Sequence, residues 1–466
     1  MSDQTDIASA DERLLNRLAG LLPPAALLVG DAIGGTYQED RRGRFSATPR
    51  FVLRPTNTAE VSASLAACND FRQPLVVHGG RTGLSGAHRI RDGEGVVSLE
   101  RMTGVGKVLH ESATVLASAG APLQVVQELA QANGYLFGVD IGARGTATIG
   151  GNLATNAGGI RVMRYGMFRA QVAGLETVLA DGTILSDLRG LEKDNTGYDL
   201  KQLFVGSEGT LGVVTRAVLK LHPKPFDAVN ALIAVSSLAA AISLLERLRK
   251  QFRSALSAFE LMLPEAFDGA VDYLKVQRPI TSHAPFYVLA EIETSANSAE
   301  LDAFSACLME VLEEGSASDA VISQSSREYQ ALWDIRDSMA DYIRTLDNIV
   351  GGDISVPVNR MEAFLSQSKA AVRAIDPLTR FFIFGHLGDG NLHYVISSPQ
   401  AREAISRVYQ LAADHGGSIS AEHGIGVDKK QWLHLVRSEA EIVTMRRIKT
   451  ALDPNCILNR GRIFDM

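Results

Sequence analysis

The chain reads Val76-Val-His-Gly-Gly-Arg-Thr-Gly-Leu-Ser-Gly86 and, further on, Ala147-Thr-Ile-Gly-Gly-Asn-Leu-Ala-Thr-Asn-Ala-Gly-Gly159. A third glycine-rich stretch is Gly206-Ser-Glu-Gly-Thr-Leu-Gly212. Successive glycines with interleaved Ser, Thr and Asn let backbone N–H groups converge on an anion, and pyrophosphate is a common guest. Each stretch alone could be a set of tight turns in a β-rich domain. Three of them in one half of the chain favour a cradle for a dinucleotide.

Two familiar nucleotide-binding patterns are missing from these stretches. None of them reads Gly-x-Gly-x-x-Gly between a strand and a helix, so a Rossmann fingerprint is absent. The Gly-Lys-Ser/Thr of a Walker loop is absent as well. The predicted cradle must therefore belong to another fold.

Near the C-terminus, two apolar runs flank the dipeptide Asp389-Gly390, in Phe381-Phe-Ile-Phe-Gly-His-Leu-Gly-Asp-Gly-Asn-Leu-His-Tyr-Val-Ile396. Asp-Gly between such runs predicts a hairpin with a two-residue turn. Counting outward then places His386 opposite His393, with Asn391 on the same face. Directly opposed residues have Cβ atoms roughly 4.5–5.5 Å apart. Two imidazoles at that separation can bind one metal ion.

A second acid–imidazole cluster reads Ser420-Ala-Glu-His-Gly-Ile-Gly426. Two histidines and a carboxylate, with a fourth position open, are the ligand set of a catalytic zinc site. We therefore predict that His386, His393 and Glu422 are metal ligands. In an extended segment His423 would point to the other side, where it is free to act as a base. A histidine pair in a hairpin can also be only a polar face, but the glycines around the imidazoles leave room for a substrate.

Composition narrows the class of protein. The 466 residues are 46% hydrophobic with a mean hydropathy of +0.04, which indicates a globular chain. A net charge of -7 without a long Lys/Arg block argues against a nucleic-acid partner. Three widely spaced cysteines suggest a reducing compartment. No signal peptide or apolar run of about 20 residues is evident, so we expect a cytoplasmic protein without a transmembrane segment.

Changes in pattern along the chain predict an α+β organisation. Residues 1–47 contain an amphipathic leucine helix that stops at Pro23-Pro24 and packs on the next domain. Residues 48–224 hold the glycine stretches. Residues 225–420 alternate strand, helix and strand twice, which suggests a ferredoxin-like sheet that includes the metal-binding hairpin. Residues 421–466 are expected to return to the glycine-rich domain.

The motifs resemble a known family. The glycine segments are similar to the flavin-binding domain of the vanillyl-alcohol oxidase / p-cresol methylhydroxylase (PCMH) superfamily. Residues 48–464 as a whole resemble its FAD-linked D-2-hydroxy acid dehydrogenases. The segments that carry this resemblance are 149–159, 385–393 and 421–426. It implies a PCMH-type FAD-binding domain in residues 48–224 and a ferredoxin-like cap, or substrate, domain in residues 225–420.

The resemblance also implies a reaction. Such enzymes oxidise a D-2-hydroxy acid, of the D-lactate or D-2-hydroxyglutarate type, to the 2-oxo acid by hydride transfer from C2 to flavin N5. We expect non-covalent FAD and Zn²⁺, or another divalent metal such as Mn²⁺. The electrons would pass to an electron-transfer flavoprotein or a quinone, and a homodimer would be usual. Two alternatives remain, an FAD-binding subunit of a glycolate-oxidase-like complex and a metal-dependent hydrolase.

By resemblance, cofactor roles fall on four segments. The pyrophosphate loop would consist of Gly79, Gly80, Arg81, Thr82, Gly83, Leu84 and Ser85. The flavin and its ribityl chain would lie over Thr148, Gly150, Gly151, Asn152, Asn156, Ala157 and Gly158. The adenine side would be lined by Glu208, Gly209 and Val213, and Asn459 would close the site.

Catalytic roles follow in the same way. His386, His393 and Glu422 fall where the family binds zinc, and His423 where it has its base. Arg336 matches the arginine that holds the substrate carboxylate, and Asn391 is assigned to the substrate with it.

The chain departs from the family pattern at several positions. Arg81 replaces the third glycine of Gly-Gly-Gly-Thr, and Arg460 and Arg462 replace the Pro and Lys of Asn-Pro-Gly-Lys. Ala340 and Gly351 replace a threonine and a lysine of the 2-hydroxyglutarate enzymes. Arg344, one helical turn beyond Ala340, is the nearby cation that could substitute. We therefore predict that monocarboxylates such as D-lactate compete well with D-2-hydroxyglutarate.

Overall fold

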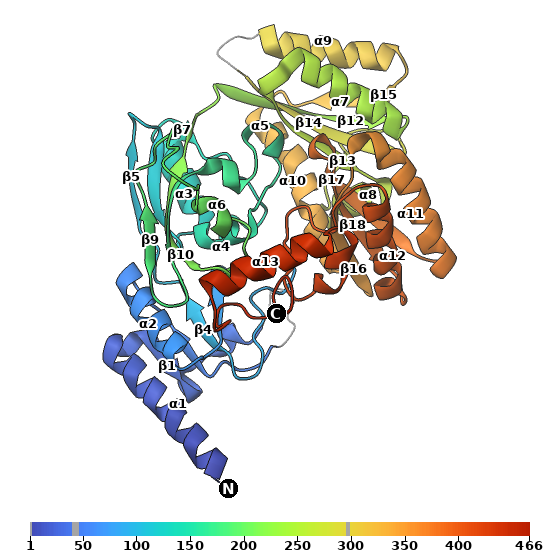
Figure 1. Cartoon of the computed structure of the whole chain (residues 1–466). Coiled ribbons are helices and arrows are strands. Elements are labelled where there is room, and N and C mark those ends of the chain that lie inside the picture. Colours follow the sequence, from blue (N-terminus) through green and yellow to red (C-terminus); the bar gives the residue numbers. More distant parts are fainter. Residues whose placement is uncertain (1, 40–45, 295–298) are drawn as a thin grey trace. The chain divides into compact units, whose positions relative to one another are not determined.

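Four sheets organise the computed structural model, which describes residues 2–39, 46–294 and 299–466 (Figure 1). The described residues form two units. The first comprises Met1–Ala157, Met167–Pro223 and Glu422–Met466, and the second Gly158–Gly166 and Lys224–Ala421. Each unit therefore gathers segments that are far apart in the sequence.

The first unit contains three sheets. One has the order β1-β2-β4-β3, with strands Leu27–Val29, Phe51–Leu53, Gly95–Ser98 and Leu75–His78. A second, antiparallel sheet has the order β5-β6-β10-β8-β9, with strands Val105–Leu109, Thr114–Ser118, Val213–Lys220, Val172–Val178 and Ile184–Asp187. β7 (Tyr135–Leu136) pairs with β11 (His222–Pro223).

The helices of the first unit cover these sheets. They are α1 (Ser2–Leu21), α2 (Thr58–Asp70), α3 (Leu123–Ala132), α4 (Ile149–Thr155), α6 (Lys201–Phe204) and α13 (Glu439–Leu452). The predicted leucine helix is confirmed, because α1 ends at Leu21 and buries Leu14 and Leu18. These leucines join the core of the unit.

The second unit is built on one seven-stranded antiparallel sheet, in the order β15-β12-β14-β13-β17-β18-β16. Its strands are β12 (Asp227–Val235), β13 (Leu256–Met262), β14 (Phe286–Thr294), β15 (Ala317–Ile322), β16 (Ile349–Ser355), β17 (Arg380–His386) and β18 (Asn391–Ser397). Its helices are α5 (Val162–Tyr165), α7 (Leu238–Phe252), α8 (Pro264–Leu274), α9 (Ala299–Glu313), α10 (Ser326–Arg344), α11 (Met361–Ile375) and α12 (Ala401–Asp414).

The predicted strand–helix–strand repeats are confirmed as β12-α7-β13 and β14-α9-β15. Within the sheet these strands lie in the order β15-β12-β14-β13, so the two repeats interleave as in a ferredoxin-like fold. The predicted hairpin, β17 and β18, extends this sheet beyond β13. The sheet therefore brings the hairpin histidines beside residues from the middle of the chain.

The predicted turn of this hairpin is wrong. The turn spans Leu387–Gly390 rather than two residues, because Leu387 is fully buried and begins a 3-10 turn that ends at Gly390, whose φ is +80°. The register consequently pairs His393 with Phe384 and not with His386. The shift is by two residues, and side chains alternate between faces with a period of two. Both histidines therefore still share a face, with ring centroids 5.3 Å apart.

Helices cover the opposite face of this end of the sheet. Tyr394 donates a hydrogen bond to Ser368 of α11 (3.1 Å), and Gly352 lies against Ile405 and Tyr409 of α12. On the histidine face, α8 and α10 pack against Phe382 and Phe384 in an apolar core. The histidine face therefore lies on the side of α8 and α10.

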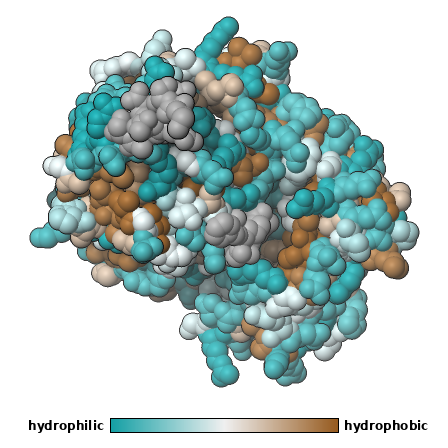
Figure 2. Space-filling model, turned by 90° about the horizontal axis from the view of Figure 1, so that it is seen from below, coloured by the Kyte–Doolittle hydropathy of each residue, from teal (hydrophilic) through white to brown (hydrophobic). Residues whose placement is uncertain are grey.

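The surface is mixed in character. The view in Figure 2 is largely hydrophilic, with separate hydrophobic areas. Among the helices in the described part of the chain, none combines the length and the apolar composition that crossing a membrane requires.

Candidate functional site

A pocket opens in the first unit. The glycine stretches predicted to form a dinucleotide cradle meet in its wall, although they are separated by dozens of residues in the sequence. Its lining consists of Val77, Gly79, Gly80, Arg81, Thr82, Gly83, Ala87, His88, Leu99, Thr148, Gly150, Gly151, Asn152, Ala154, Thr155, Phe204, Ser207, Glu208, Gly209, Gly212, Val214 and Asn459.

Backbone atoms approach so closely in this wall that side chains do not fit. A Cβ atom at Gly80 would overlap the carbonyl oxygen of Thr146, and one at Gly79 would lie 2.6 Å from Thr148 Oγ1. Asn152 Nδ2 is buried and has no hydrogen-bond partner among the residues that the structure describes. A bare backbone cradle with an unsatisfied buried donor fits a large polar ligand such as FAD.

Six residues predicted to bind the cofactor lie outside this wall: Leu84, Ser85, Asn156, Ala157, Gly158 and Val213. Val213 is fully buried in β10, where it belongs to the core. Asn156 ends α4 in a left-handed conformation, and its Oδ1 accepts a hydrogen bond from Arg169 N (2.9 Å). Gly158 is the first residue of the second unit. These residues therefore do not line the pocket.

Glu208 lines the pocket but also holds a neighbouring loop. Its carboxylate accepts hydrogen bonds from Ile425 N (2.6 Å) and Gly426 N (2.8 Å). Burial raises the pKa of this carboxyl, and the two backbone donors oppose that change. Ser85 Oγ donates to the carbonyl oxygens of His423 (2.9 Å) and Gly424 (2.8 Å). Two residues assigned to the cofactor thus fix the loop that carries His423.

The backbone conformation at Arg81 explains why the family usually has a glycine at this position. Its φ is +54°, in the left-handed region that side chains rarely adopt. The guanidinium lies 5.2 Å from the ring centroid of Tyr37 and 3.9 Å from Glu100. These contacts draw the side chain away from the backbone, so the replacement of glycine is accommodated with a cation at the wall of the pocket.

The C-terminal residues close the first unit. Asn459 Oδ1 accepts from Val77 N (2.8 Å), and its Nδ2 donates to Glu208 O (2.6 Å). Arg462 is fully buried and forms a two-pronged ion pair with Glu94 (2.5 and 2.9 Å). The arginine at the family's lysine position therefore serves packing rather than the pocket.

The wall also contains residues that the motifs did not reveal. Phe204, Ser207 and Gly212 adjoin or belong to the third glycine stretch, so its extension would have found them. His88 lies two residues beyond the first glycine stretch, so an extension of that stretch would have found it as well. Leu99 carries no recognisable signal, and only the fold brings it to the pocket.

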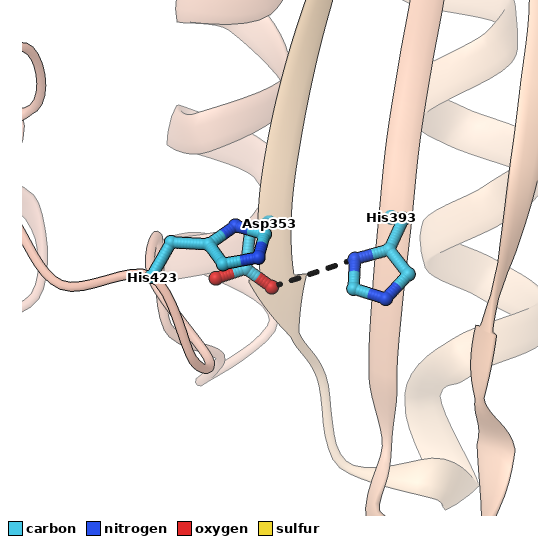
Figure 3. A group of neighbouring side chains, drawn as sticks. All are labelled: Asp353, His393 and His423. Atoms are coloured by element: carbon cyan, nitrogen blue, oxygen red, sulfur yellow. Dashed lines mark ion pairs between the residues drawn. The ribbon is translucent and has the colours of Figure 1, made fainter. Parts of the chain in front are cut away.

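The second candidate centre lies on the histidine face of the large sheet. One ligand atom each from His386, His393 and Glu422 lies within 4.8 Å of the others, and the same holds for Asp353, His393 and His423. Figure 3 shows Asp353 and His393 on strands and His423 on a loop. His393 Nδ1 lies 3.8 Å from Asp353 Oδ1. These two groups make a donor set of imidazoles and carboxylates, which suits a divalent transition metal.

Glu422 and His423 reach this cluster through their own chain. Ser420 forms a bridge with Asp353, and Ala421 N donates to Asp353 O (3.3 Å). These contacts fix the chain at Ala421, directly before Glu422 and His423. Both imidazoles and Glu422 are thus brought together as predicted, and each is assigned to the metal or to the substrate in the proposal below.

Asp353, which belongs to the cluster, and Glu260, which lies beside it, were not predicted from the sequence. Asp353 is buried in β16 directly opposite His393 of β18. Asn391 Nδ2 donates to Asp353 Oδ1 (2.9 Å), whereas Asn391 Oδ1 is buried and has no partner in the described part of the chain. Glu260, fully buried in β13, contacts His386 and Arg336. An unsatisfied buried oxygen next to the donor set supports a bound cation or substrate hydroxyl.

Arg336 lies beside the cluster on α10. It is 7% exposed, its Nε donates to Glu260 Oε2 (2.6 Å), and its guanidinium lies 5.1 Å from the ring centroid of Phe384. Although burial alone would raise the pKa of Glu260, its interactions with Arg336 and then His386 lower it to about 2. The arginine is thus held beside the histidine face, as a carboxylate-binding residue requires.

Ala340, Gly351 and Arg344, the positions considered for binding a second substrate carboxylate, are exposed or partly exposed. Ala340 is exposed on α10. Arg344 is also exposed, forms an ion pair with Asp341 and donates from Nε to Ala340 O (3.2 Å). Gly351 is partly exposed and lies opposite Val395. Arg344 therefore lies over Ala340, at the surface rather than in a buried position like Arg336.

Comparison with known protein families identifies both halves of the chain. Residues 49–187 match the family described as "FAD binding domain", and residues 224–463 match "FAD linked oxidases, C-terminal domain".

Curated relatives match over nearly the whole chain. The chain is 37% identical to D-2-hydroxyglutarate dehydrogenase of Xanthomonas citri pv. viticola, over 98% of this chain and 97% of that protein. It is 35% identical to D-2-hydroxyglutarate dehydrogenase of Stutzerimonas stutzeri, over 97% and 99%. A putative mitochondrial D-lactate dehydrogenase of Schizosaccharomyces pombe is 32% identical, over 97% and 87%.

Solved structures share the fold. The structure of p-cresol methylhydroxylase with substrate bound has a TM-score of 0.79 at 15% identity, over 98% of this chain and 97% of that chain. A structure of alkyldihydroxyacetonephosphate synthase has a TM-score of 0.74 at 17% identity, over 96% and 84%. These likenesses confirm the predicted α+β architecture.

Proposed function

This chain belongs to the FAD-linked oxidases, and we propose that it is an FAD-dependent dehydrogenase that oxidises a D-2-hydroxy acid to the 2-oxo acid with the help of a divalent metal ion. The names of the curated relatives support the substrate class. The observation that carries the metal-assisted chemistry is the cluster of His386, His393 and Glu422 beside Arg336. A metal-dependent hydrolase would leave the match to an FAD-binding domain unexplained.

The chain's own residues supply binding and proton transfer. The glycine wall would hold FAD without a covalent bond, and FAD would supply the hydride acceptor; the two histidines and Glu422 would hold a divalent ion, which would supply charge stabilisation. Arg336 would orient the substrate carboxylate with the donors that Glu260 leaves available. His423 would accept the proton of the C2 hydroxyl. An electron-transfer flavoprotein or a quinone would then reoxidise the cofactor.

The sheet face suggests which hydroxy acid fits. Asp353, His393 and Phe384 form one row across β16, β18 and β17, and the next row consists of Gly351, Val395 and Phe382. Opposed residues, and residues two apart on a strand, share a face. The row beside the metal cluster is therefore apolar.

An apolar row disfavours a second substrate carboxylate. A desolvated charge without a partner costs several kcal/mol. Arg344, which lies four residues beyond Ala340 and seven before Gly351, is exposed and already ion-paired with Asp341. We therefore propose that monocarboxylates such as D-lactate, or D-2-hydroxy acids with a longer apolar tail, compete well with D-2-hydroxyglutarate.

A substrate panel tests this proposal. We would measure kcat/KM with a dye acceptor for D-2-hydroxyglutarate, D-malate, D-lactate and D-2-hydroxybutyrate. We expect D-2-hydroxyglutarate to be favoured by less than 100-fold, which corresponds to about 2.7 kcal/mol. No turnover of any member by the yellow, metal-loaded protein would contradict the proposed reaction itself.

Variants at Gly351 sharpen the panel. A Cβ there would lie 3.5 Å from Val395 Cγ2, an ordinary contact, so a side chain fits. Gly351→Lys should raise the preference for D-2-hydroxyglutarate by about tenfold or more, because a cation would join the apolar row. Gly351→Leu adds bulk without charge and should not. If the wild type already prefers D-2-hydroxyglutarate 100-fold and Arg344→Ala removes that preference, Arg344 is the replacement and the apolar-row argument is wrong.

A further inference from the structure

We infer that Glu260 is a positioning residue that fixes a metal ligand, His386, and the substrate arginine, Arg336, with a single carboxylate. This inference rests on the proposed metal-assisted function. It assigns a role to a residue that no sequence motif marked, and it links the metal cluster to the carboxylate-binding side chain through one buried group.

The geometry divides the carboxylate between two partners. Glu260 lies on β13 directly opposite His386 on β17, and neither its side chain nor its backbone is exposed. Its Oε1 lies 2.6 Å from His386 Nδ1, and its Oε2 accepts from Arg336 Nε at 2.6 Å. Each oxygen therefore serves a different side chain.

The contact between Glu260 and His386 determines which nitrogen of the His386 imidazole carries the hydrogen. An ionised carboxylate has no proton to donate, so His386 Nδ1 must carry the hydrogen. In a neutral imidazole the lone pair is then on Nε2, which is the nitrogen that can bind a metal ion. Glu260 thus selects the ligating form of His386.

The second contact sets the direction of the guanidinium. Glu260 takes the Nε edge of Arg336, and Phe384 lies beneath its plane at 5.1 Å. Neither terminal nitrogen makes a hydrogen bond to a residue in the described ranges 2–39, 46–294 and 299–466. This leaves a two-pronged donor for a substrate carboxylate, the geometry in which arginine binds such groups best.

The same sheet contains a second buried glutamate that is not connected to the cluster. Glu291 on β14 is fully buried and pairs with Arg161 (2.9 Å). It also accepts from Ser257 (2.6 Å), from Trp333 Nε1 (2.9 Å) and from Tyr329. None of these partners is a candidate metal ligand. Glu291→Gln is therefore a matched control that removes an equally buried, arginine-paired charge from the neighbouring strand.

The experiment compares metal affinity in full-length, FAD-loaded protein after chelation. In Glu260→Gln the amide has one oxygen and one NH₂ group, so it cannot accept from both partners. Facing His386, the NH₂ would donate to Nδ1 and move the imidazole proton to Nε2. We expect the Kd for Mn²⁺, and separately for Zn²⁺, to rise roughly 10–100-fold, the usual effect of losing such a supporting group. Glu291→Gln should remain within about threefold of the wild type.

Kinetics provide a second readout in the same proteins. At saturating metal, Glu260→Gln should raise KM for the hydroxy acid, because the amide oxygen that remains for Arg336 carries no charge and anchors the guanidinium more weakly. Glu291→Gln should not raise it, even if its melting temperature falls by as much. A change in stability without these two effects would indicate a merely structural role and would overturn the inference.

The outcomes separate the inference from the proposed function. If the wild type binds neither Mn²⁺ nor Zn²⁺, the proposed function fails. If the wild type binds an ion and Glu260→Gln binds it within threefold, the inference fails. Should Glu260→Gln not fold, ¹⁵N-histidine NMR of the metal-free wild type at pH 8, assigned with His386→Gln, decides the point. We expect the Nδ1–H form of His386, and the Nε2–H form would overturn the inference.

Discussion

The pocket of the first unit and the histidine face of the second are built on opposite principles. The pocket is a backbone cradle in which the absence of side chains at Gly79 and Gly80 is what matters. The histidine face is a set of side chains from four strands and a helix, joined through Glu260 and Asp353. Binding in the pocket should therefore weaken when side-chain atoms are added to its glycines. Binding at the histidine face should weaken when side-chain atoms are removed.

Loss of a single ligand should produce the largest effect and show that the two regions act separately. His393→Ala, or chelation, should lower kcat by roughly 10³-fold or more, because a metal ion supplies several kcal/mol of charge stabilisation. The protein should remain yellow, since the pocket lining contains no hairpin residue. Metal analysis, flavin absorbance and a dye assay check this, with exposed His283→Ala as the control. Loss of flavin together with metal would break the comparison.

Metal content and the rate of flavin reduction in a His423 variant show whether His423 is a metal ligand or a general base. His423→Asn should retain one ion per chain while flavin reduction slows by about 10²–10⁴, the usual contribution of general base catalysis. An empty metal site in this variant would assign His423 to ligation, as its place with Asp353 and His393 also allows.

Adding one methyl group to the pocket should be the next largest effect. Gly80→Ala would force a Cβ against the carbonyl oxygen of Thr146, and overpacking typically costs about 1–3 kcal/mol, or roughly 10–100-fold in FAD affinity. Gly83→Ala places its Cβ 3.7 Å from His88 Nδ1, an ordinary contact, and should weaken binding much less. Fluorescence titration of apoprotein with FAD measures both. Equal affinities in the two variants would show that backbone approach does not define this pocket.

The smallest effect concerns a histidine that is structural rather than ligating. Burial, and then neighbouring His88, lower the pKa of His78 from 6.5 to about 3. The unfolded chain therefore binds a proton there as the pH falls below 6.5, whereas the folded chain does not. Stability is full above that pH and is lost as the pH falls towards 3, by about 2 kcal/mol at pH 5.

Substitution of His78 tests this account. Its Nε2 lies 2.8 Å from His88 O, so His78→Gln keeps a donor but cannot gain a proton. The loss of unfolding free energy between pH 8 and pH 5, measured in urea, should shrink by about 2 kcal/mol. Exposed His110→Gln should leave that loss unchanged. An identical pH dependence in both variants would mean that His78 is not the group responsible.

The sequence by itself determined what depends on contiguous residues. Each glycine stretch carries its own backbone requirement, so the cradle could be predicted before the fold was known. The shared face of His386 and His393 was also predictable, because a register shift of two residues preserves alternation. The ferredoxin-like order of strands and helices followed from local periodicity.

Only the tertiary structure decided which side chains support these motifs. Glu260 lies 126 residues from His386 and 76 from Arg336; the pairing of β13 with β17 and the packing of α10 bring the three together. The hairpin register depended on the burial of Leu387, which changed a two-residue turn into a longer one. Glu208 was predicted as a cofactor contact, yet its carboxylate holds the backbone after His423. Long-range pairing and burial set such partners, and neither leaves a local pattern in the chain.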